Sequence, residues 1–140
     1  MNKPIVFIDM DGVLADLDQG LFEMFNVKEP EGSRDRLFKE YLPAYTEAGM
    51  FFKQPVLKNA QILIRTLCRL YHEGSINLAI CTSTGQFYRP VSEVRDQKSK
   101  WIEHHFPELV DIPFCTTTSG RDKSILAHPN AFLIDDHFKN

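Results

Sequence analysis

The sequence predicts an α/β domain in which helices flank a sheet of parallel strands. Short apolar runs of strand length alternate along the chain with longer segments whose apolar residues recur at helical spacing. Strands that alternate with helices are typical of β-α-β units, which place their strands side by side and parallel. With 140 residues, of which 43% are hydrophobic, the chain is long enough for one domain with its own core.

The predicted strands are four apolar runs, each of which ends in polar or turn-forming residues. They comprise residues 4–8, 76–81, 112–115 and 131–134. Short runs without polar alternation are typical of parallel strands that are covered on both faces. We therefore expect a Rossmann-like sheet that begins with the run at residues 4–8.

The predicted helices follow from apolar residues spaced three or four apart and from the residues that stop them. They span residues 14–27, 34–42, 44–48, 59–73 and 91–106. Pro43 and Gly49 are predicted to end two short helices, and Gly74 to end the long one at 59–73. An apolar stripe along the helix at 59–73 comprises Ile62, Leu63, Leu67, Leu70 and Tyr71, and one side of the helix at 91–106 carries Trp101, Ile102 and Phe106.

The segment between the first predicted strand and the helix at 59–73 is too long for a simple crossover. We expect residues 17–55 to form a small helical cap, inserted after the first strand and lying over the carboxyl edge of the sheet. The core of the single domain, residues 1–140, would then comprise residues 1–16 and 56–140.

Charge and cysteine content narrow the classes of partner. A net charge of −3 and a pI near 5.9 provide no positive field for DNA or acidic membranes, so binding to long nucleic acids is not expected. No apolar run approaches the roughly 20 residues of a membrane span. The cysteines, at positions 68, 81 and 115, lack the spacing of a disulfide framework or a metal site. We expect a cytoplasmic protein with reduced, buried thiols.

Two aspartates, Asp9 and Asp11, follow the first predicted strand directly and precede Gly12. In open α/β sheets, ligands bind beyond the carboxyl ends of the strands. Two carboxylates this close repel each other unless a cation or a shared proton offsets their charges. Aspartate and glycine are also the ordinary residues of tight turns, so this motif alone fits a plain strand exit as well as a metal site.

Two further strand ends carry polar residues of complementary chemistry. Thr82 and Ser83 follow the second predicted strand, and Asp135 and Asp136 follow the last one. Hydroxyls and backbone N–H groups at a strand end suit phosphate oxygens, and carboxylates that converge on one crevice suit Mg²⁺. Each pair taken alone also fits a simpler role, as a helix cap or as a solvated tail.

A phosphate at this edge needs a cationic side chain, for which Lys98 and Lys123 are the candidates. Lys98 lies among Arg95, Asp96 and Lys100, and such a charge run is usually a solvated helix face. On these residues alone, a phosphate ligand and a surface lysine are both open interpretations.

Taken together, these motifs resemble the haloacid dehalogenase (HAD) superfamily of Mg²⁺-dependent phosphotransferases. The matching motifs are, in order, Asp9-Met-Asp11-Gly-Val, Thr82-Ser83, a lysine and Asp135-Asp136. Within the superfamily, the chain is similar to the 5'(3')-deoxyribonucleotidases through stretches spread over most of its length. Those stretches are residues 9–16, 49–52 with Pro55, 80–83, 97–103, 121–123 and 133–136. The resemblance implies an HAD-like fold.

The resemblance also implies a mechanism with an aspartyl-phosphate intermediate. Asp9 would attack phosphorus, while Asp11 would protonate the leaving oxygen and then activate the water that hydrolyses the intermediate. Asp9, the backbone carbonyl of Asp11 and Asp135 would hold Mg²⁺, with Asp136 acting through water or from farther out.

For the phosphate itself, the resemblance implies three ligands: Thr82, Ser83 and Lys98 would hold the phosphoryl oxygens. Lys98 is preferred as the lysine of the third motif because it stands three residues before Trp101, as in the family. Lys123 would be a second basic contributor.

The substrate implied by the resemblance is a deoxynucleoside monophosphate, whose base would stack on Phe51 or Phe52 in the cap. The same chemistry would serve another small phosphomonoester or a nucleic-acid phosphate end. The chain ends four residues after Asp136, so a shortened homologue that is inactive or regulatory is a further alternative, and a homodimer would be one way to cover the surface left there. A signalling receiver domain is disfavoured, because its acidic pair follows the first strand and its acceptor aspartate a middle one.

Overall fold

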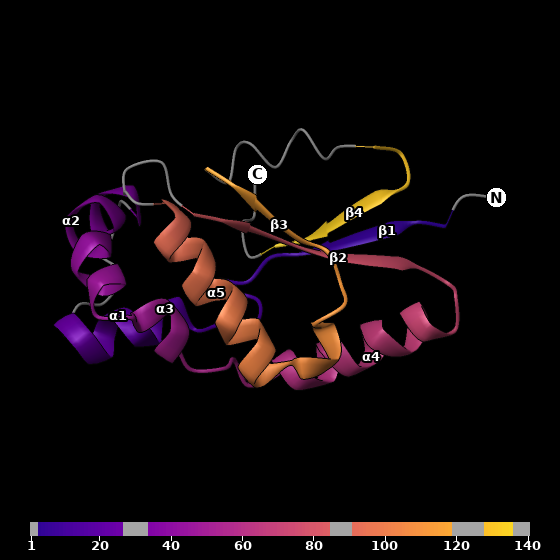
Figure 1. Ribbon diagram of the computed structural model, residues 1–140, viewed down its shortest axis with the longest axis horizontal. Helices are drawn as coiled ribbons and strands as arrows, with labels where there is room; N and C mark the ends of the chain where they lie inside the picture. Colours follow the sequence, from indigo (N-terminus) through magenta and orange to yellow (C-terminus); the bar gives the residue numbers. More distant parts are fainter. Residues whose placement is uncertain (1–2, 27–33, 85–90, 119–127, 136–140) are drawn as a thin grey trace.

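The computed structural model describes residues 3–26, 34–84, 91–118 and 128–135. In this part of the chain, four strands form one sheet in the order β3-β2-β1-β4, and all neighbouring strands run parallel (Figure 1). The strands are β1 (Ile5–Ile8), β2 (Asn77–Ser83), β3 (Phe114–Thr117) and β4 (Ala131–Ile134). The predicted α/β fold, with a parallel sheet flanked by helices, is confirmed.

β1 lies in the interior of the sheet, between β2 and β4. Ile8, its last residue, pairs with Ile80 of β2 on one side and with Ile134 of β4 on the other. The chain adds β2 and β3 on one side of β1 and then returns to place β4 on the other side. In doubly wound sheets, ligands bind outside the carboxyl ends of the strands at such a reversal of direction. The topology therefore indicates the carboxyl ends of β1 and β4 as the place where a ligand would bind.

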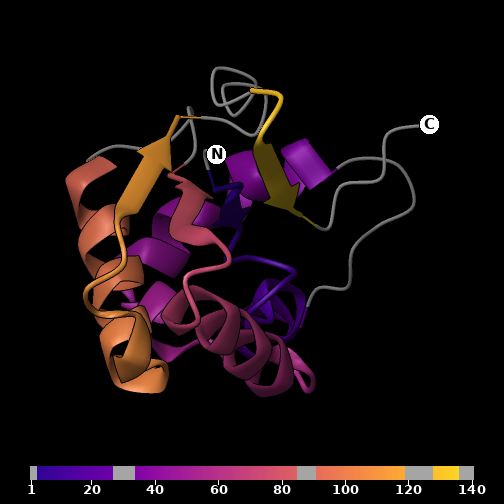
Figure 2. The ribbon, with the colours of Figure 1, turned by 90° about the vertical axis from the view of Figure 1, so that its right-hand side faces the viewer.

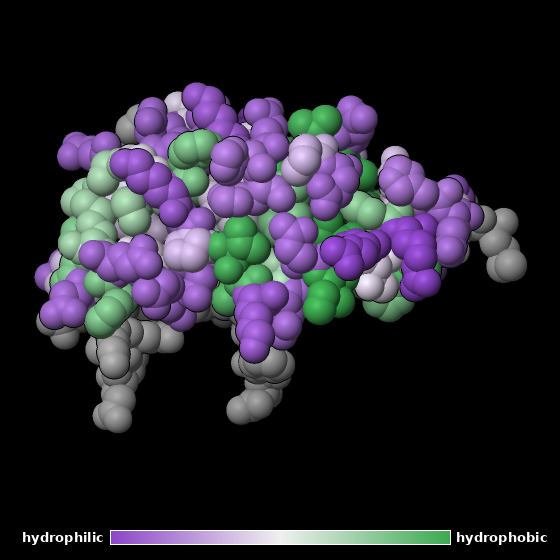
Figure 3. Space-filling model, turned by 90° about the horizontal axis from the view of Figure 1, so that it is seen from below, coloured by the Kyte–Doolittle hydropathy of each residue, from purple (hydrophilic) through white to green (hydrophobic). Residues whose placement is uncertain are grey.

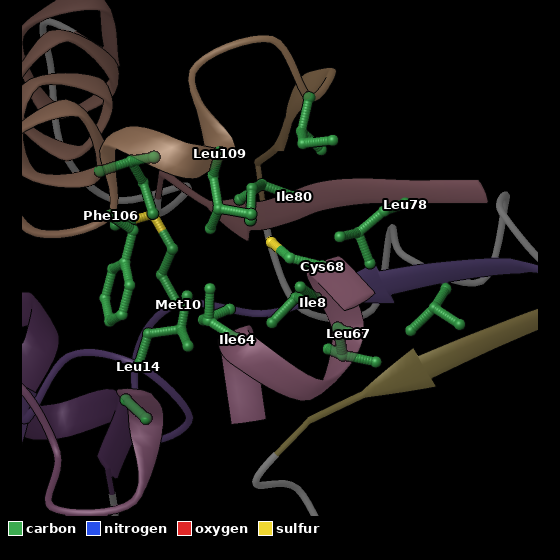
Figure 4. Close-up of a cluster of buried hydrophobic side chains, with 14 of the residues drawn as sticks. Ile8, Met10, Leu14, Ile64, Leu67, Cys68, Leu78, Ile80, Phe106 and Leu109 are labelled. Atoms are coloured by element: carbon green, nitrogen blue, oxygen red, sulfur yellow. The ribbon is translucent and has the colours of Figure 1, made fainter. Parts of the chain in front are cut away.

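One face of the sheet carries the main core. The helices on this face are α4 (Ala60–His72), α5 (Val91–His105) and the 3₁₀ helix η1 (Pro107–Leu109), as Figures 1 and 2 show. Side chains alternate along a strand, and those that pack against these helices are Val6, Ile8, Leu78 and Ile80. Figure 4 shows this cluster. The opposite face carries a smaller cluster of Phe7, Ala79 and Cys81.

α4 meets the sheet along a stripe that overlaps the one expected: Leu67 is buried there, and Leu63, Leu70 and Tyr71 pack against the core partly buried. Ala60, Ile64, Leu67 and Cys68 are buried, and their spacing of four, three and one residues is that of a single helix face. Ile62, which the expected apolar stripe included, is 63% exposed and lies off the buried face. Residues 62 and 64 lie about 200° apart around a helix of 3.6 residues per turn, so burial of one exposes the other.

Three helices lie between β1 and α4, and we call them the inserted helices: α1 (Leu17–Phe25), α2 (Arg34–Glu47) and α3 (Met50–Lys53). The predicted break at Pro43 was wrong, because α2 continues through this residue. A proline inside a helix removes one backbone donor. The buried residues Tyr45 and Thr46 follow it, and the burial of that last turn offsets the missing hydrogen bond.

The inserted helices have a small core of their own, which α5 completes. Leu17 and Leu21 of α1 pack there with Tyr45, Phe51 and Val94. The chain enters and leaves this region along two adjacent segments. The amide of residue 16 donates to the carbonyl of Pro55 over 2.8 Å, and the amide of residue 57 donates to the carbonyl of Leu14 over the same distance.

The surface on the side of the helices is dominated by hydrophilic residues (Figure 3). Among the described residues, no helix is long and apolar enough to cross a membrane. The described cysteines, Cys68, Cys81 and Cys115, form no disulfide; the first two are buried and the third is half-buried.

Candidate active site

A tight loop after β1 fixes the first aspartate at the edge of the sheet. The N–H of Asp9 donates to the carbonyl of Ile134 over 3.0 Å, and the N–H of Met10 donates to the Asp9 carboxylate over 2.8 Å. The carbonyl of Met10 then accepts from the amides of residues 13, 14 and 15. Gly12 has φ of +81°, a conformation that glycine adopts without strain. This loop buries Asp9 and leaves Asp11 half-buried.

Asp135 lies beside Asp9 because of the register between β1 and β4. Ile8 pairs with Ile134, and each aspartate is the next residue along its strand. The hydrogen bond from the Asp9 amide to Ile134 continues this pairing beyond the last paired residues. The carboxylate-bearing residues of two strand ends are thus neighbours, as the sequence predicted for parallel strands.

Lys98, on α5, is buried with its ammonium group between β2 and the loop after β1. Its side chain is only 1% exposed. Nζ donates to Oδ2 of Asp11 over 2.8 Å, to Oγ1 of Thr82 over 2.9 Å and to the carbonyl of Ser83 over 2.6 Å. An ammonium group has three donors, so these contacts use all of them. The interpretation of this lysine as part of a solvated helix face was wrong.

The ion pair with Asp11 makes this burial possible. A buried charge without a partner costs several kcal/mol, whereas a buried pair that is also hydrogen-bonded offsets that cost. The ring of Phe51 adds a favourable contact, with its centroid 5.0 Å from Nζ. A fully satisfied buried lysine next to two strand ends is a preorganised positive charge at the carboxyl edge of the sheet.

Thr82 and Ser83 reach the site as the last residues of β2. The predicted strand ended at residue 81, but the structure continues β2 to Ser83 and pairs these residues with β3. Thr82 follows Leu78 and Ile80 at alternate positions, so its buried side chain points to the helix-covered face. There it meets Lys98, while Ser83 contributes its carbonyl.

The two phenylalanines of α3 occupy different surroundings. Phe51 is 3% exposed, and its ring packs edge-to-face on Tyr45 with centroids 4.9 Å apart. Phe52 is 39% exposed and lies against His104, 5.8 Å between ring centroids. The structure buries the ring of Phe51 next to Lys98. The exposed ring of Phe52 lies near the C-terminal end of α5.

Gln54 is a site residue that sequence reasoning missed. Its buried side chain lies over Asp11, with Nε2 3.4 Å from Oδ1. Its Oε1 accepts from the Tyr45 hydroxyl over 2.9 Å, and its carbonyl accepts from the Trp101 indole over 2.8 Å. Burial raises the pKa of Tyr45 above its usual range, and the charge of Asp11 adds to that effect. No spacing in the sequence distinguishes this glutamine from a surface residue.

Gln97 is a second buried amide that was not predicted, and it ties the inserted helices to α5. Its Oε1 accepts from the amide of Phe51 over 3.2 Å, and its Nε2 donates to the carbonyl of Thr46 over 2.8 Å. Both partners are backbone groups of the inserted helices. Gln97 therefore holds α2 and α3 against the helix that carries Lys98.

Lys123 and Asp136 lie outside the described residues, so their predicted roles stay predictions. Within the described ranges, no group of three or more histidine, cysteine, aspartate or glutamate side chains is arranged to hold a metal ion. Comparison of the chain with models of protein families and with curated proteins found no significant match.

Proposed function

We propose that this protein is a Mg²⁺-dependent phosphatase of the HAD type that hydrolyses small phosphomonoesters through an aspartyl-phosphate on Asp9. The observation that carries the proposal is the buried ammonium of Lys98, which contacts Asp11, Thr82 and Ser83 beside the Asp9 loop. Phosphoryl transfer requires of a protein mainly positioning and charge stabilisation. A preorganised cation, a hydroxyl and two aspartates at one sheet edge are the groups needed for that.

In this proposal the residues act in a fixed order. Asp11, which is ion-paired with Lys98 before substrate binds, first takes a proton from the phosphomonoester as a phosphoryl oxygen replaces it on Lys98. A carboxylate oxygen of Asp9 then bonds to phosphorus as the bond from phosphorus to the leaving oxygen breaks, and Asp11 gives its proton to that oxygen. Asp11 then takes a proton from water, which attacks phosphorus and releases phosphate and Asp9. Lys98 exchanges Asp11 for a phosphoryl oxygen and keeps Thr82 and Ser83, because its three donors are already in use.

Two carboxylate-bearing residues at adjacent strand ends support the proposal of a magnesium ion. The register that sets Asp9 beside Asp135 places two carboxylate-bearing residues on adjacent strand ends, and Mg²⁺ prefers such hard oxygen ligands. By the family resemblance, these two carboxylates and the backbone carbonyl of Asp11 would hold the ion, with Asp136 contributing through water. When bound, Mg²⁺ would neutralise part of the phosphate charge.

The substrate class rests on two different arguments. The resemblance to 5'(3')-deoxyribonucleotidases supports a deoxynucleoside monophosphate. The burial of Phe51 favours a second candidate, another small phosphomonoester, because this ring, which lies against Lys98, has little free surface for stacking. Phe52 exposes its ring but lies against His104, six residues or about 9 Å along α5 from Lys98.

Phosphate release with Mg²⁺ present tests the proposal. The panel comprises 5'- and 3'-monophosphates of deoxynucleosides and nucleosides, sugar phosphates and p-nitrophenyl phosphate. We expect turnover of at least one substrate, which Asp9→Asn abolishes while the far-UV circular dichroism is unchanged. The matched control is Asp96→Asn, the same change at an exposed position of α5, and it should retain turnover. Folded wild-type protein without turnover on the whole panel would overturn the proposal and favour a regulatory homologue.

A further inference from the structure

Gln54 connects Asp11 to the inserted helices and to α5. Its side-chain amide lies between the Asp11 carboxylate and the Tyr45 hydroxyl, and all of these groups are buried or half-buried. Its backbone carbonyl accepts from the indole of Trp101, which is fully buried. The next residue, Pro55, accepts from the amide of residue 16 at the point where the chain returns to the sheet. Gln54 is therefore held on both its side chain and its backbone.

The orientation of the Gln54 amide follows from its neighbours. Nε2 faces two acceptors, Oδ1 of Asp11 at 3.4 Å and the carbonyl of Phe51 at 3.5 Å. Neither can donate to an amide oxygen when the carboxyl group is ionised, so the NH₂ end must face them. Oε1 then faces Tyr45, whose hydroxyl donates over 2.9 Å. The Phe51 carbonyl and the Asp11 carboxylate thus set the orientation in which the amide presents a donor to Asp11, and the Tyr45 hydroxyl anchors the other end of the amide.

The two oxygens of Asp11 have different partners. Oδ1 is approached by Gln54 from the inserted helices, and Oδ2 is bound by Lys98 from α5. Under the proposed function Lys98 leaves Oδ2 for the phosphate, whereas nothing in the chemistry requires Gln54 to leave Oδ1. Oδ1 of Asp11 then keeps Gln54 as its partner, and Oδ2 becomes free to contact the leaving group.

We propose that Gln54 is a positioning residue for the phosphatase reaction: it holds Oδ1 of Asp11 so that Oδ2 serves the leaving group. This inference rests on the proposed function. It predicts that replacing Gln54 lowers kcat/KM most for substrates whose leaving group must be protonated as it departs. An alkoxide, such as the 5'-oxygen of a nucleoside, needs protonation as it departs, and p-nitrophenolate needs little.

The test measures kcat/KM for two substrates, because this constant reports the steps up to release of the leaving group. The substrates are p-nitrophenyl phosphate and the alkyl phosphomonoester that the wild-type protein hydrolyses fastest. Gln54→Met keeps the length of the side chain and removes the amide. We expect kcat/KM for the alkyl ester to fall by about 10- to 100-fold and that for p-nitrophenyl phosphate by less than about threefold.

Gln97→Met is the matched control. It removes another buried amide at the contact between the inserted helices and α5, but one whose partners are the backbone of Phe51 and of Thr46 and the side chain of Glu93 rather than Asp11. It should lower the melting temperature and leave the ratio of the two kcat/KM values within about twofold of wild type. Tyr45→Phe serves as a second variant if Gln54→Met does not fold, and it should shift the ratio in the same direction by a smaller factor.

The outcomes separate the two proposals. A wild-type protein without turnover overturns the proposed function and this inference with it. A wild-type protein that turns over both substrates, with a Gln54→Met variant that loses activity equally on both, overturns only the role of Gln54. A change in the ratio for Gln97→Met as large as for Gln54→Met also overturns it, because the effect would then come from the packing of the inserted helices.

Discussion

The buried ammonium of Lys98 needs an anionic partner, both in this structure and during the proposed reaction. Its ammonium is removed from water, so it needs charge compensation in this structure, which Asp11 supplies. Under the proposed function it also needs another anionic partner when Asp11 donates its proton, and a phosphoryl oxygen of the substrate would be that partner. Arginine would not fill the same place, because its planar group cannot converge on the three oxygens that surround Nζ.

Replacement of Lys98 by methionine is expected to lower kcat/KM for every substrate by about 100- to 1000-fold, the effect of deleting one preorganised group that stabilises charge. The fold should persist, because Asp11 is 23% exposed and water can hydrate it once the cation is gone. Phosphate release and thermal unfolding measure the two effects. Lys100→Met, the same change at an exposed position of α5, should alter neither, and equal losses for both variants would contradict the assignment.

The buried hydroxyl of Tyr45 is expected to make the free energy of unfolding depend on pH in the alkaline range. Burial raises the pKa of Tyr45, and the charges of Asp11, Glu23 and Asp16 raise it further. The unfolded chain releases this proton near pH 10, while the folded protein keeps it, so the unfolded state binds fewer protons above that pH. The contribution of Tyr45 to stability is therefore complete below about pH 10 and decreases as the pH rises beyond it.

Urea unfolding at several pH values between 9 and 11 measures this effect. The free energy of unfolding of the wild-type protein should fall more steeply with pH than that of Tyr45→Phe, which has no proton to lose. The difference between the two slopes should approach about 1.4 kcal/mol per pH unit. Parallel slopes would mean that the hydroxyl is accessible to water in the folded protein.

At the scale of elements, the packing of α1 against α2 depends on one glycine. Gly20 lies in α1 and is buried against the Tyr45 hydroxyl, which an added Cβ would overlap. The next nearest atom, Cζ of Tyr45, would be 3.3 Å away. In an exposed helix, replacing glycine by alanine stabilises by about 1 kcal/mol. Here the overlap opposes that gain, and overpacking costs about 1–3 kcal/mol.

Gly20→Ala is therefore expected to destabilise the protein in spite of the better helix propensity of alanine. In a Tyr45→Phe background the hydroxyl is gone, and the same substitution should be close to neutral or stabilising. A double-mutant cycle by urea unfolding would give a coupling energy of about 1–3 kcal/mol. Additive effects of the two substitutions would show that the helices separate to accept the methyl group.

The elements that the sequence predicted well are those set by local pattern. The strand at residues 131–134 was predicted with the bounds of β4, and α4 and α5 were predicted within one residue at each end. The errors arose where packing overrides local preference. Pro43 does not stop α2, and pairing with β3 extends β2 through Thr82 and Ser83. Such effects depend on residues far away in the sequence, which no local pattern contains.

The residues of the candidate site also differ in whether a local sequence pattern could predict them. Asp9, Asp11 and Asp135 were found because they follow strands, and strand ends can be located from sequence. The sequence left Lys98 between a buried ligand and a surface charge, because a helix with charges on several sides does not show which face is buried. Gln54 and Gln97 gave no signal, since a buried amide is recognised only by the groups that it contacts.

At the scale of the whole molecule, the candidate site lies where β1, β4 and the inserted helices, which are separate segments of the chain, come together. β1 and β4 lie next to each other although their sequences are more than 120 residues apart, and their carboxyl ends bring Asp9 beside Asp135. The inserted helices approach the same edge through Gln54. Within the described residues, β4 pairs only with β1, so it has one neighbour while β1 and β2 have two.

A metal ion held by Asp9 and Asp135 would therefore join β4, the strand with one described neighbour, to the interior strand β1. At a Mg²⁺ concentration of ten times Kd, binding to the folded state alone stabilises by about 1.4 kcal/mol, which corresponds to a rise in Tm of about 4 °C. The amides of β4 should also exchange more slowly with Mg²⁺ than with EDTA, because local opening of β4 would then require loss of the ion. Asp135→Asn should abolish both effects, and Asp111→Asn, at an exposed position before β3, should preserve them. If Mg²⁺ raised Tm equally in Asp135→Asn and in wild type, the ion would bind elsewhere, and the part of the proposed mechanism that depends on the end of β4 would be wrong.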